Sequence, residues 1–432
     1  MWLLNTKTYC LEEHHSHEVP KYVILSHTWQ EEEVLYQEMR DSSGGYQSKA
    51  GYRKIKTCCD LAAAQRISYA WVDTCCIDKL HSAELSEAIN SMYSYYRNAR
   101  KCFIYLADVP GNLSGSRLSR TRQLCALESS RWFTRGWTLQ ELIASSGRKF
   151  YAEDWSLIRV DTKFMAVIAK VTGIDLMLLQ NRELLSGYCT ATRMSWASKR
   201  RTTRPEDMAY CLMGIFNISM PILYGEGAKK AFQRLQTEIM NTSFDQSIFV
   251  WRGPYANSGL LANSPSDFAD TPILGLWAPA NLAPTTMTNV GFHARLLFCK
   301  QPEEGPDYAN NPLSAAQFGM SLDANRRLAA VQCDIFSDDG VWKAVFVHLM
   351  LLPGAHCFLN GQKCNAYRRN ACAKLVVLDR GILDECEWED ALVLQDDQYN
   401  LVNYSIKEHN RRWGTQHSVY TNQIYLGEEN VI

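Results

Sequence analysis

The first third of the chain alternates short apolar runs with segments of helical periodicity. Residues 22–26, 69–73 and 102–106 are rich in β-branched and aromatic side chains, and each run ends in polar residues, which is typical of buried strands. Residues 52–65 and a segment capped by Ser82 repeat their apolar side chains at the spacing of one helix face. Strands and helices in alternation predict a parallel sheet with right-handed crossovers, so this region is expected to form an α/β domain.

The middle of the chain is predicted to be helical. Residues 124–145 continue as one helix around Glu141, residues 149–151 form a further strand, and helices prevail from residue 157 to residue 241. Within this stretch, residues 203–206 (TRPE) have the pattern of a capping box and are expected to open a helix over 207–216. Residues 224–227 (YGEG) then predict a structural turn before a helix over 228–240.

From residue 246 the pattern changes to short apolar runs separated by Pro, Gly, Asn and Asp, which predicts a β-rich domain, either a sandwich or a barrel. The expected division is therefore an α/β domain over 1–156, a helical extension over 157–245 and a β-rich domain of unassigned role over 246–432.

Composition excludes several classes of protein. The net charge of −1 gives no electrostatic reason to expect a nucleic acid or an anionic membrane as the main partner. The N-terminus lacks the pattern of a signal peptide, and the longest apolar run, residues 344–352, is too short to span a bilayer, so a cytoplasmic protein without a membrane span is expected. The 15 cysteines are scattered without a Cys-x-x-Cys pair, which indicates reduced thiols and no metal site.

Polar residues follow the predicted strands at the points where ligands bind in open parallel sheets. Ser26, His27 and Trp29 come at the end of the first strand, and Asp73 ends the second. Residues 130–142 (SRWFTRGWTLQEL) then place one carboxylate, Glu141, on a helix just after two tryptophans and two arginines. A single acid among aromatic and cationic side chains predicts a functional site.

Three blocks of the sequence resemble the fungal heterokaryon-incompatibility (HET) domain. They are residues 22–29 (YVILSHTW), 71–79 (WVDTCCIDK) and 135–141 (RGWTLQE). Residues 193–197, 200–210 and 224–227 are similar to the stretch that usually follows this domain, so the resemblance extends over the first 245 residues. It rests on the order and spacing of the blocks, and the β-rich part carries no comparable motif.

HET domains are thought to be distant relatives of Toll/interleukin-1-receptor (TIR) domains, so the resemblance implies a TIR/flavodoxin-like sheet. Residues 137–142 (WTLQEL) are similar to the TIR pattern Trp-Cys-x-x-Glu-Leu, with Thr138 in place of the cysteine. In enzymatic TIR domains the glutamate of this pattern supports cleavage of NAD at the nicotinamide–ribose bond. The resemblance thus implies an NAD-consuming cell-death or immune effector, with Glu141 as the catalytic residue and NAD as a substrate rather than a cofactor.

One carboxylate is sufficient for this reaction. Nicotinamide leaves NAD as a neutral molecule and needs no general acid, so the task is to stabilise an oxocarbenium-like ribose. The tryptophans Trp29 and Trp137 can stack on the nicotinamide or adenine ring. The diphosphate can be met by Ser26, by backbone amides after the first strand, and by Arg131 or Arg135. His27, as a proton carrier, and Asp73, as a ligand contact, complete the predicted binding set.

Other interpretations stay open for several of these residues. Glu141 can be a solvated or ion-paired helix residue, the tryptophans can be core aromatics, and Asp73 can cap a turn. Cys75 and Cys76 have no basic neighbour in sequence to activate a thiol, so burial is expected rather than nucleophilic chemistry. The basic run over 200–204 can bind phosphate or can pair with the acidic residues that follow it.

Two functions therefore compete. In the first, the chain is an NAD glycohydrolase, or a cyclase, that is switched on by self-assembly or by a protein activator because constant activity would be toxic. In the second, the HET region is a non-catalytic interaction module that triggers cell death by recruiting partners. A dinucleotide-dependent oxidoreductase is excluded because no Gly-x-Gly-x-x-Gly follows any predicted strand.

Overall fold

The computed structural model describes residues 1–15, 19–41, 44–111, 116–254, 258–271, 274–276, 285–288, 291–299, 326–336, 340–359, 362–369, 375–394, 420–421 and 424–426. The chain forms two compact units. The first comprises Met1–Tyr188 and Lys199–Leu235, and the second comprises Cys189–Ser198 and Gln236–Ile432. The division into three domains that the sequence suggested remains a prediction.

The first unit contains a six-stranded sheet in the order β2-β1-β4-β3-β5-β6. Strand β3 pairs in parallel with β4 and β5, and β5 pairs in parallel with β6, while β1 runs antiparallel to β2 and β4. The four parallel strands follow the order second, first, third, fourth, which flavodoxin-like sheets also use. The antiparallel edge pair departs from that pattern, and the TIR/flavodoxin likeness stays a prediction. The strands are β1 (Trp2–Asn5), β2 (Leu11–Glu13), β3 (Tyr22–His27), β4 (Tyr69–Trp71), β5 (Lys101–Tyr105) and β6 (Arg148–Tyr151).

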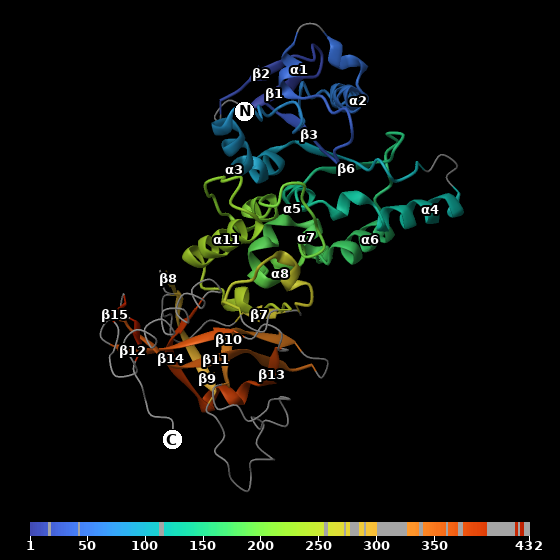
Figure 1. Cartoon of the computed structure of the whole chain (residues 1–432). Helices are drawn as coiled ribbons and strands as arrows, with labels where there is room; N and C mark the ends of the chain where they lie inside the picture. Colours follow the sequence, from blue (N-terminus) through green and yellow to red (C-terminus); the bar gives the residue numbers. More distant parts are fainter. Residues whose placement is uncertain are drawn as a thin grey trace. The chain divides into compact units, whose positions relative to one another are not determined.

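Helices connect these strands and extend the unit beyond the sheet (Figure 1). The predicted helices after β3 and β4 are confirmed as α2 and α3, and all six residues of β3 are buried, as expected for a central strand. The cap of α3 is His81 rather than Ser82, because the His81 ring accepts the backbone N–H of Glu84 at 3.3 Å. The helices described in the first unit are α1 (Tyr36–Arg40), α2 (Ala50–Ala64), α3 (Ser82–Asn98), α4 (Arg117–Glu128), α5 (Thr138–Ala144), α6 (Thr162–Thr172), α7 (Leu176–Gln180), α9 (Asp207–Tyr210) and α10 (Met213–Phe216). The second unit contains α8 (Thr190–Ser195), and α11 (Ala228–Thr242) begins in the first unit and ends in the second.

The single helix predicted over 124–145 is wrong, because the segment breaks into α4, a 3₁₀ turn η2 (Arg131–Thr134) and α5. Distant backbone groups cause the break. The N–H of Gly136 donates to the carbonyl of Arg201 at 2.9 Å, and the N–H of Arg201 donates to Thr134 at 2.7 Å. Residues 134–136 therefore pair with residue 201 as a short β-bridge would, which removes them from any continuous helix.

The predicted capping box over 203–206 is also wrong. The carboxylate of Glu206 accepts the backbone N–H groups of Gly225 and Gly227, at 2.9 Å and 3.0 Å, instead of capping its own helix. Both glycines have positive φ angles, 100° and 85°, which favour glycine and turn their N–H groups toward the acid. The expected helix over 207–216 is accordingly two short pieces, α9 and α10, while the turn predicted at 224–227 is present.

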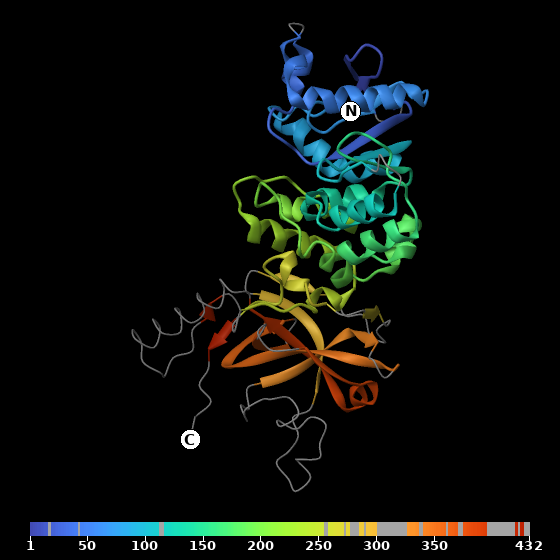
Figure 2. The same cartoon turned by 90° about the vertical axis from the view of Figure 1, so that its right-hand side faces the viewer.

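The second unit contains a closed barrel, which decides between the two β-rich folds that the sequence left open. Five strands pair in a ring, from β11 through β12, β14, β9 and β10 back to β11. Figure 2 shows these strands crossing one another steeply, as in small barrels. The ring strands are β9 (Gly291–Cys299), β10 (Arg326–Phe336), β11 (Trp342–Leu359), β12 (Gln362–Arg369) and β14 (Cys386–Val393); shorter strands are β7 (Leu274–Leu276), β8 (Thr286–Thr288), β13 (Val376–Asp379), β15 (Tyr420–Thr421) and β16 (Ile424–Leu426).

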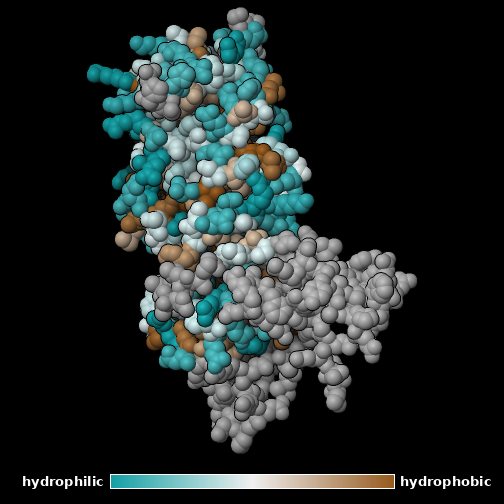
Figure 3. Space-filling view, turned by 90° about the vertical axis from the view of Figure 1, so that its left-hand side faces the viewer, coloured by the Kyte–Doolittle hydropathy of each residue, from teal (hydrophilic) through white to brown (hydrophobic). Residues whose placement is uncertain are grey.

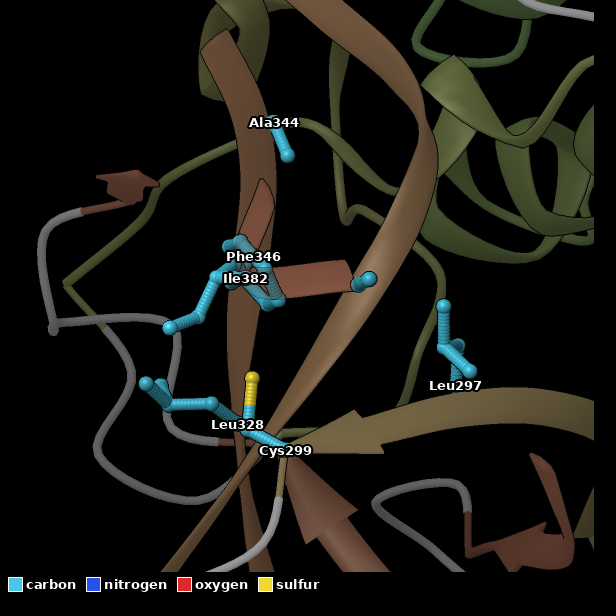
Figure 4. Close-up of a cluster of buried hydrophobic side chains, with 7 residues drawn as sticks. Leu297, Cys299, Leu328, Ala344, Phe346 and Ile382 are labelled. Carbon is cyan, nitrogen blue, oxygen red and sulfur yellow. The ribbon is translucent and has the colours of Figure 1, made fainter. Parts of the chain in front are cut away.

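One apolar cluster of the second unit joins the ring strands to the turn η7 (Arg380–Glu385). Figure 4 shows Phe346 of β11 beside Ile382 of η7, with side chains of β9 and β10 around them. Burial of such aromatic and aliphatic side chains stabilises each by about 1.5–3 kcal/mol. The cluster thus holds η7 and β13 against the barrel wall.

Over the described part of the chain, no helix is both long and apolar enough to cross a bilayer. The face drawn in Figure 3 is mainly hydrophilic over its coloured part, with small groups of apolar side chains between polar ones. Scattered apolar groups of this kind are ordinary on globular proteins.

Candidate active site

A cavity of about 230 Å³ lies in the first unit, beyond the carboxyl ends of β3 and β4. Its walls come from the ends of these strands, from α3 and α5, and from the segments before α9 and α11. It is lined by His27, Trp29, Asp73, Ile77, Lys79, Leu85, Ile89, Met92, Arg135, Trp137, Thr138, Glu141, Thr203, Arg204, Asp207 and Tyr224. Six of the residues predicted for the site, Glu141 among them, therefore lie on one cavity, whereas Ser26 and Arg131 do not line it.

Glu141 is 8% exposed, and its carboxylate is hydrogen-bonded by a side chain of the protein interior. The hydroxyl of Ser26 donates to its carboxylate, and the indole N–H of Trp132 donates to the same hydroxyl oxygen at 2.8 Å. Ser26 was predicted to contact the ligand but does not line the cavity; it orients the acid instead. Burial raises the pKa of Glu141 to about 8, and the Ser26 hydrogen bond opposes that rise.

A second carboxylate, Asp73, faces the cavity beside His27. The Nε2 atom of His27 lies 3.3 Å from Oδ1 of Asp73, and within the described residues neither atom has a hydrogen-bond partner. The indole N–H of Trp29 donates to Oδ2 of Asp73 at 2.7 Å. Burial raises the pKa of Asp73 and lowers the pKa of His27 well below its usual value, so the imidazole is neutral near pH 7. Buried polar atoms left without partners at a cavity wall indicate a place for a ligand.

The third wall comes from residues beyond 200. Asp207 accepts the indole N–H of Trp137 at 3.1 Å and the hydroxyl of Tyr224 at 2.9 Å. The guanidinium of Arg204 lies 4.0 Å from the centre of the Tyr224 ring, where a cation is attracted to the aromatic face. The guanidinium of Arg135 donates to the hydroxyl of Thr203 at 3.2 Å, which ties α5 to this wall.

Thr138 has a structural role at the position where the TIR pattern has cysteine. Its hydroxyl donates to the carbonyl of Trp132 at 2.6 Å and accepts from the guanidinium of Arg200 at 2.9 Å. The same guanidinium donates to the carbonyl of Arg135 at 2.9 Å. Thr138 thus fixes the start of α5, and with it the position of Glu141.

Several lining residues were not predicted from the sequence. Lys79, Thr203, Asp207 and Tyr224 had no assigned role in ligand binding, and Arg204 was only part of a basic run with two open interpretations. The order of the HET-like blocks was a usable signal, because residues 200–210 and 224–227 already stood among the resembling segments. Their local patterns predict a helix start in the first segment and a turn in the second, and neither pattern indicates a cavity wall.

Other candidate groups lie away from the cavity lining. Cys75 is fully buried, its hydrogen bond with Cys76 and its burial raise its thiol pKa well above the usual value, and Cys76 is 3% exposed. This burial was expected, and it leaves these thiols without nucleophilic character. The backbone N–H of Arg131 donates to Asp108 at 2.7 Å, and Arg131 is not among the lining residues. In the part of the chain that the structure describes, no group of three His, Cys, Asp or Glu side chains could hold a metal ion.

Comparison with known proteins gives two family matches. Residues 22–114 match the model of the heterokaryon incompatibility protein (HET) family, and residues 230–279 match a domain of unknown function, DUF8212. The HET match includes His27, Trp29 and Asp73, while Glu141 lies beyond its end.

The vegetative incompatibility protein HET-E-1 of Podospora anserina is 46% identical to the chain over 226 residues. These residues are 52% of this chain and 16% of the relative, so the chain spans about a sixth of the length of the protein it resembles. No solved structure matches the chain.

Proposed function

The chain carries a heterokaryon-incompatibility domain, and from this premise we propose that it is a fungal cell-death effector that hydrolyses NAD at the nicotinamide–ribose bond. The observation that carries the proposal is the setting of Glu141, a buried carboxylate on the lining of a cavity that Trp29 and Trp137 also line. The matching relative is a vegetative incompatibility protein, which supports the incompatibility role.

The proposed reaction breaks the bond between C1′ of the ribose and the nicotinamide nitrogen. The bonding electrons leave with nicotinamide, which becomes neutral, and the ribose becomes an oxocarbenium-like cation. An ionised Glu141 beside the ribose stabilises that cation by charge. Water then bonds to C1′ and loses a proton, so that NAD and water give ADP-ribose, nicotinamide and one proton.

The environment of Glu141 implies a pH dependence. With a pKa of about 8 the carboxyl is mostly protonated at neutral pH in the empty cavity. A substrate that brings the positive charge of the nicotinamide ring favours the ionised form, as an opposite charge does for any acid. We therefore expect kcat/KM to rise with pH up to about 8.

Regulation follows from the toxicity of the proposed reaction, since an effector that always consumed NAD would kill its own cell. We propose that self-assembly or a protein activator switches it on, and that it acts in the cytoplasm. The barrel unit is the candidate for this control, because the chemical groups described above belong to the first unit.

The test is NAD consumption by the purified chain, with nicotinamide and ADP-ribose resolved as products and protein concentration varied. Glu141→Gln should lower kcat by about 10²–10³-fold, the usual effect of removing one preorganised charge-stabilising group. Glu153→Gln is the matched control, because Glu153 is an exposed acid that does not line the cavity.

Full turnover in Glu141→Gln would overturn the assignment of the acid. Absence of turnover at every concentration, with and without fungal extract, would overturn the enzyme and favour the non-catalytic interaction module.

A further inference from the structure

Three cationic side chains line the cavity without a carboxylate partner. Within the described residues, Lys79, Arg135 and Arg204 form no ion pair. Lys79 lies 3.8 Å from the centre of the Trp29 ring, and its ammonium nitrogen has no hydrogen-bond partner there. Arg135 donates only to a hydroxyl, and Arg204 stacks on a tyrosine ring. Three cations at one cavity repel one another, and a bound anion would relieve that repulsion.

The cations come from three separate parts of the chain. Lys79 follows β4, Arg135 precedes α5, and Arg204 lies in the segment before α9. Only the fold brings these side chains together, so local sequence composition does not account for the cluster. Asp73 and Asp207 lie near the cluster and attract Lys79 and Arg204 electrostatically, but within the described residues each carboxylate is hydrogen-bonded to an indole N–H and forms no ion pair with the three cations.

The acid and the histidine of the cavity are buried, whereas its cations are more exposed to solvent. Glu141 and His27 are buried at 8% and 6% exposure, Lys79 and Arg135 are partly exposed, and Arg204 is exposed. A volume of about 230 Å³ is below the roughly 300–1,000 Å³ of sites that enclose a whole drug-sized ligand. A long ligand would therefore place one end beside the buried acid and extend past the cations toward solvent.

We propose that Arg204, with Arg135 and Lys79, binds the diphosphate of a dinucleotide whose glycosidic bond lies at Glu141. The segment that carries Arg204 then belongs to the substrate site, although it lies outside the residues that match the HET family model. This inference rests on the proposed function and adds Arg204 and Lys79 to Arg135 as the residues that would bind the diphosphate of the substrate.

The chemistry of arginine suits this role. A guanidinium that stacks on an aromatic face still presents its N–H groups at its edge, where they bind phosphate oxygens in pairs. Stacking on Tyr224 also orders the side chain before the ligand arrives, and Asp207 holds that tyrosine through its hydroxyl. Less ordering is then required when the ligand binds.

Binding of ADP-ribose, measured by calorimetry on the full chain, tests the inference without requiring turnover. Arg204→Gln should weaken ADP-ribose about tenfold, the effect of losing one charge-assisted contact. The same variant, combined with Glu141→Gln to prevent cleavage, should leave the affinity for nicotinamide riboside unchanged. Lys79→Gln and Arg135→Gln should act in the same direction, and the affinity for ADP-ribose should fall with added salt.

The matched control is Arg201→Gln, which removes a nearby exposed arginine that does not line the cavity. Unchanged ADP-ribose binding in all three cavity variants, or no binding to the wild type at millimolar ligand, would overturn the inference. An equal loss of affinity for nicotinamide riboside would also overturn the inference, because the cations would then maintain the shape of the cavity rather than bind phosphate. Melting curves of each variant separate loss of binding from loss of folding.

The two proposals fail separately. ADP-ribose binding that depends on Arg204 in a chain without NAD turnover would leave the phosphate site standing and refute the hydrolase. NAD turnover by the wild type, together with an unchanged KM for NAD in Arg204→Gln, would support the hydrolase and refute the phosphate site.

Discussion

Buried charges are treated differently in the two units of the molecule. In the barrel unit, Arg369 is 2% exposed and donates to the carbonyls of Phe249 and Trp251, both at 2.6 Å, with its guanidinium 4.1 Å from the Trp251 ring. In the α/β unit, the ammonium of Lys79 is buried without a hydrogen-bond partner among the described residues. A buried charge that its own chain satisfies supports the fold, whereas one left unsatisfied costs stability and is available to a ligand.

The largest expected effect is on Arg369. Arg369→Leu leaves two buried carbonyls without donors and should lower the free energy of unfolding by about 3–5 kcal/mol. Urea unfolding followed by tryptophan fluorescence measures the change. Arg159→Gln is the control, since the Arg159 side chain is 85% exposed and lies 3.9 Å from Asp161 in a pair worth about 0–1 kcal/mol at most. Equal stability of Arg369→Leu and the wild type would remove the distinction between the two units.

The next effect concerns Glu141 and pH. Its folded pKa of about 8 lies above the usual value of 4.5, so the folded chain keeps a proton that the unfolded chain has lost. This contribution to stability is complete below pH 4.5 and disappears as pH rises through 8, at up to about 1.4 kcal/mol per pH unit. Glu141→Gln lacks it, so the variant should gain stability relative to the wild type between pH 5 and pH 9. Parallel unfolding curves of the two proteins at every pH would contradict the buried, protonated acid.

A smaller effect on stability is expected at Asp207, a carboxylate of the cavity wall that accepts two hydrogen bonds from its own chain. Asp207→Asn exchanges two charge-assisted hydrogen bonds, from Trp137 and Tyr224, for weaker neutral ones. It should lower the free energy of unfolding by about 1–2 kcal/mol and loosen the ring on which Arg204 stacks. Thermal unfolding and ADP-ribose affinity are the two measurements. A change in affinity without any change in stability would mean that Asp207 contacts the ligand itself.

The smallest effect on stability is expected at Lys79. Burial lowers its pKa, so the folded chain pays to keep it charged near pH 7. Lys79→Met should leave stability unchanged within about 0.5 kcal/mol or raise it, while ADP-ribose binding weakens. Thermal unfolding of the variant beside Lys163→Met, an exposed lysine outside the cavity, measures the stability change. Marked destabilisation would show that Lys79 has a structural partner after all.

The sequence predicted the parallel strands and most of their helices, because their signals are local. Apolar runs of strand length ending in polar residues identified β3, β4 and β5, and the rule that ligands bind at strand ends led to His27, Trp29 and Asp73. Glu141 was found in the same way, since one acid among aromatics and cations is visible in a short segment.

The failures share one cause, which is hydrogen bonding between segments far apart in the chain. Gly136 leaves the predicted helix because its N–H donates to Arg201, and Glu206 leaves its predicted cap because Gly225 and Gly227 supply better donors. No periodicity within either segment records a partner that is tens of residues away.

By itself, the sequence of this protein determined an α/β region followed by a β-rich one, and it determined which strand ends carry the polar side chains that line the cavity. Only the tertiary structure decided that the β-rich region closes as a barrel, since closure depends on β11 pairing with both β10 and β12. Only the tertiary structure placed Arg204, Asp207 and Tyr224 beside Glu141. The local sequence pattern of a helix or strand determines which of its faces is buried. A cavity wall depends instead on how distant segments pack together, and the pattern of a single segment does not record that packing.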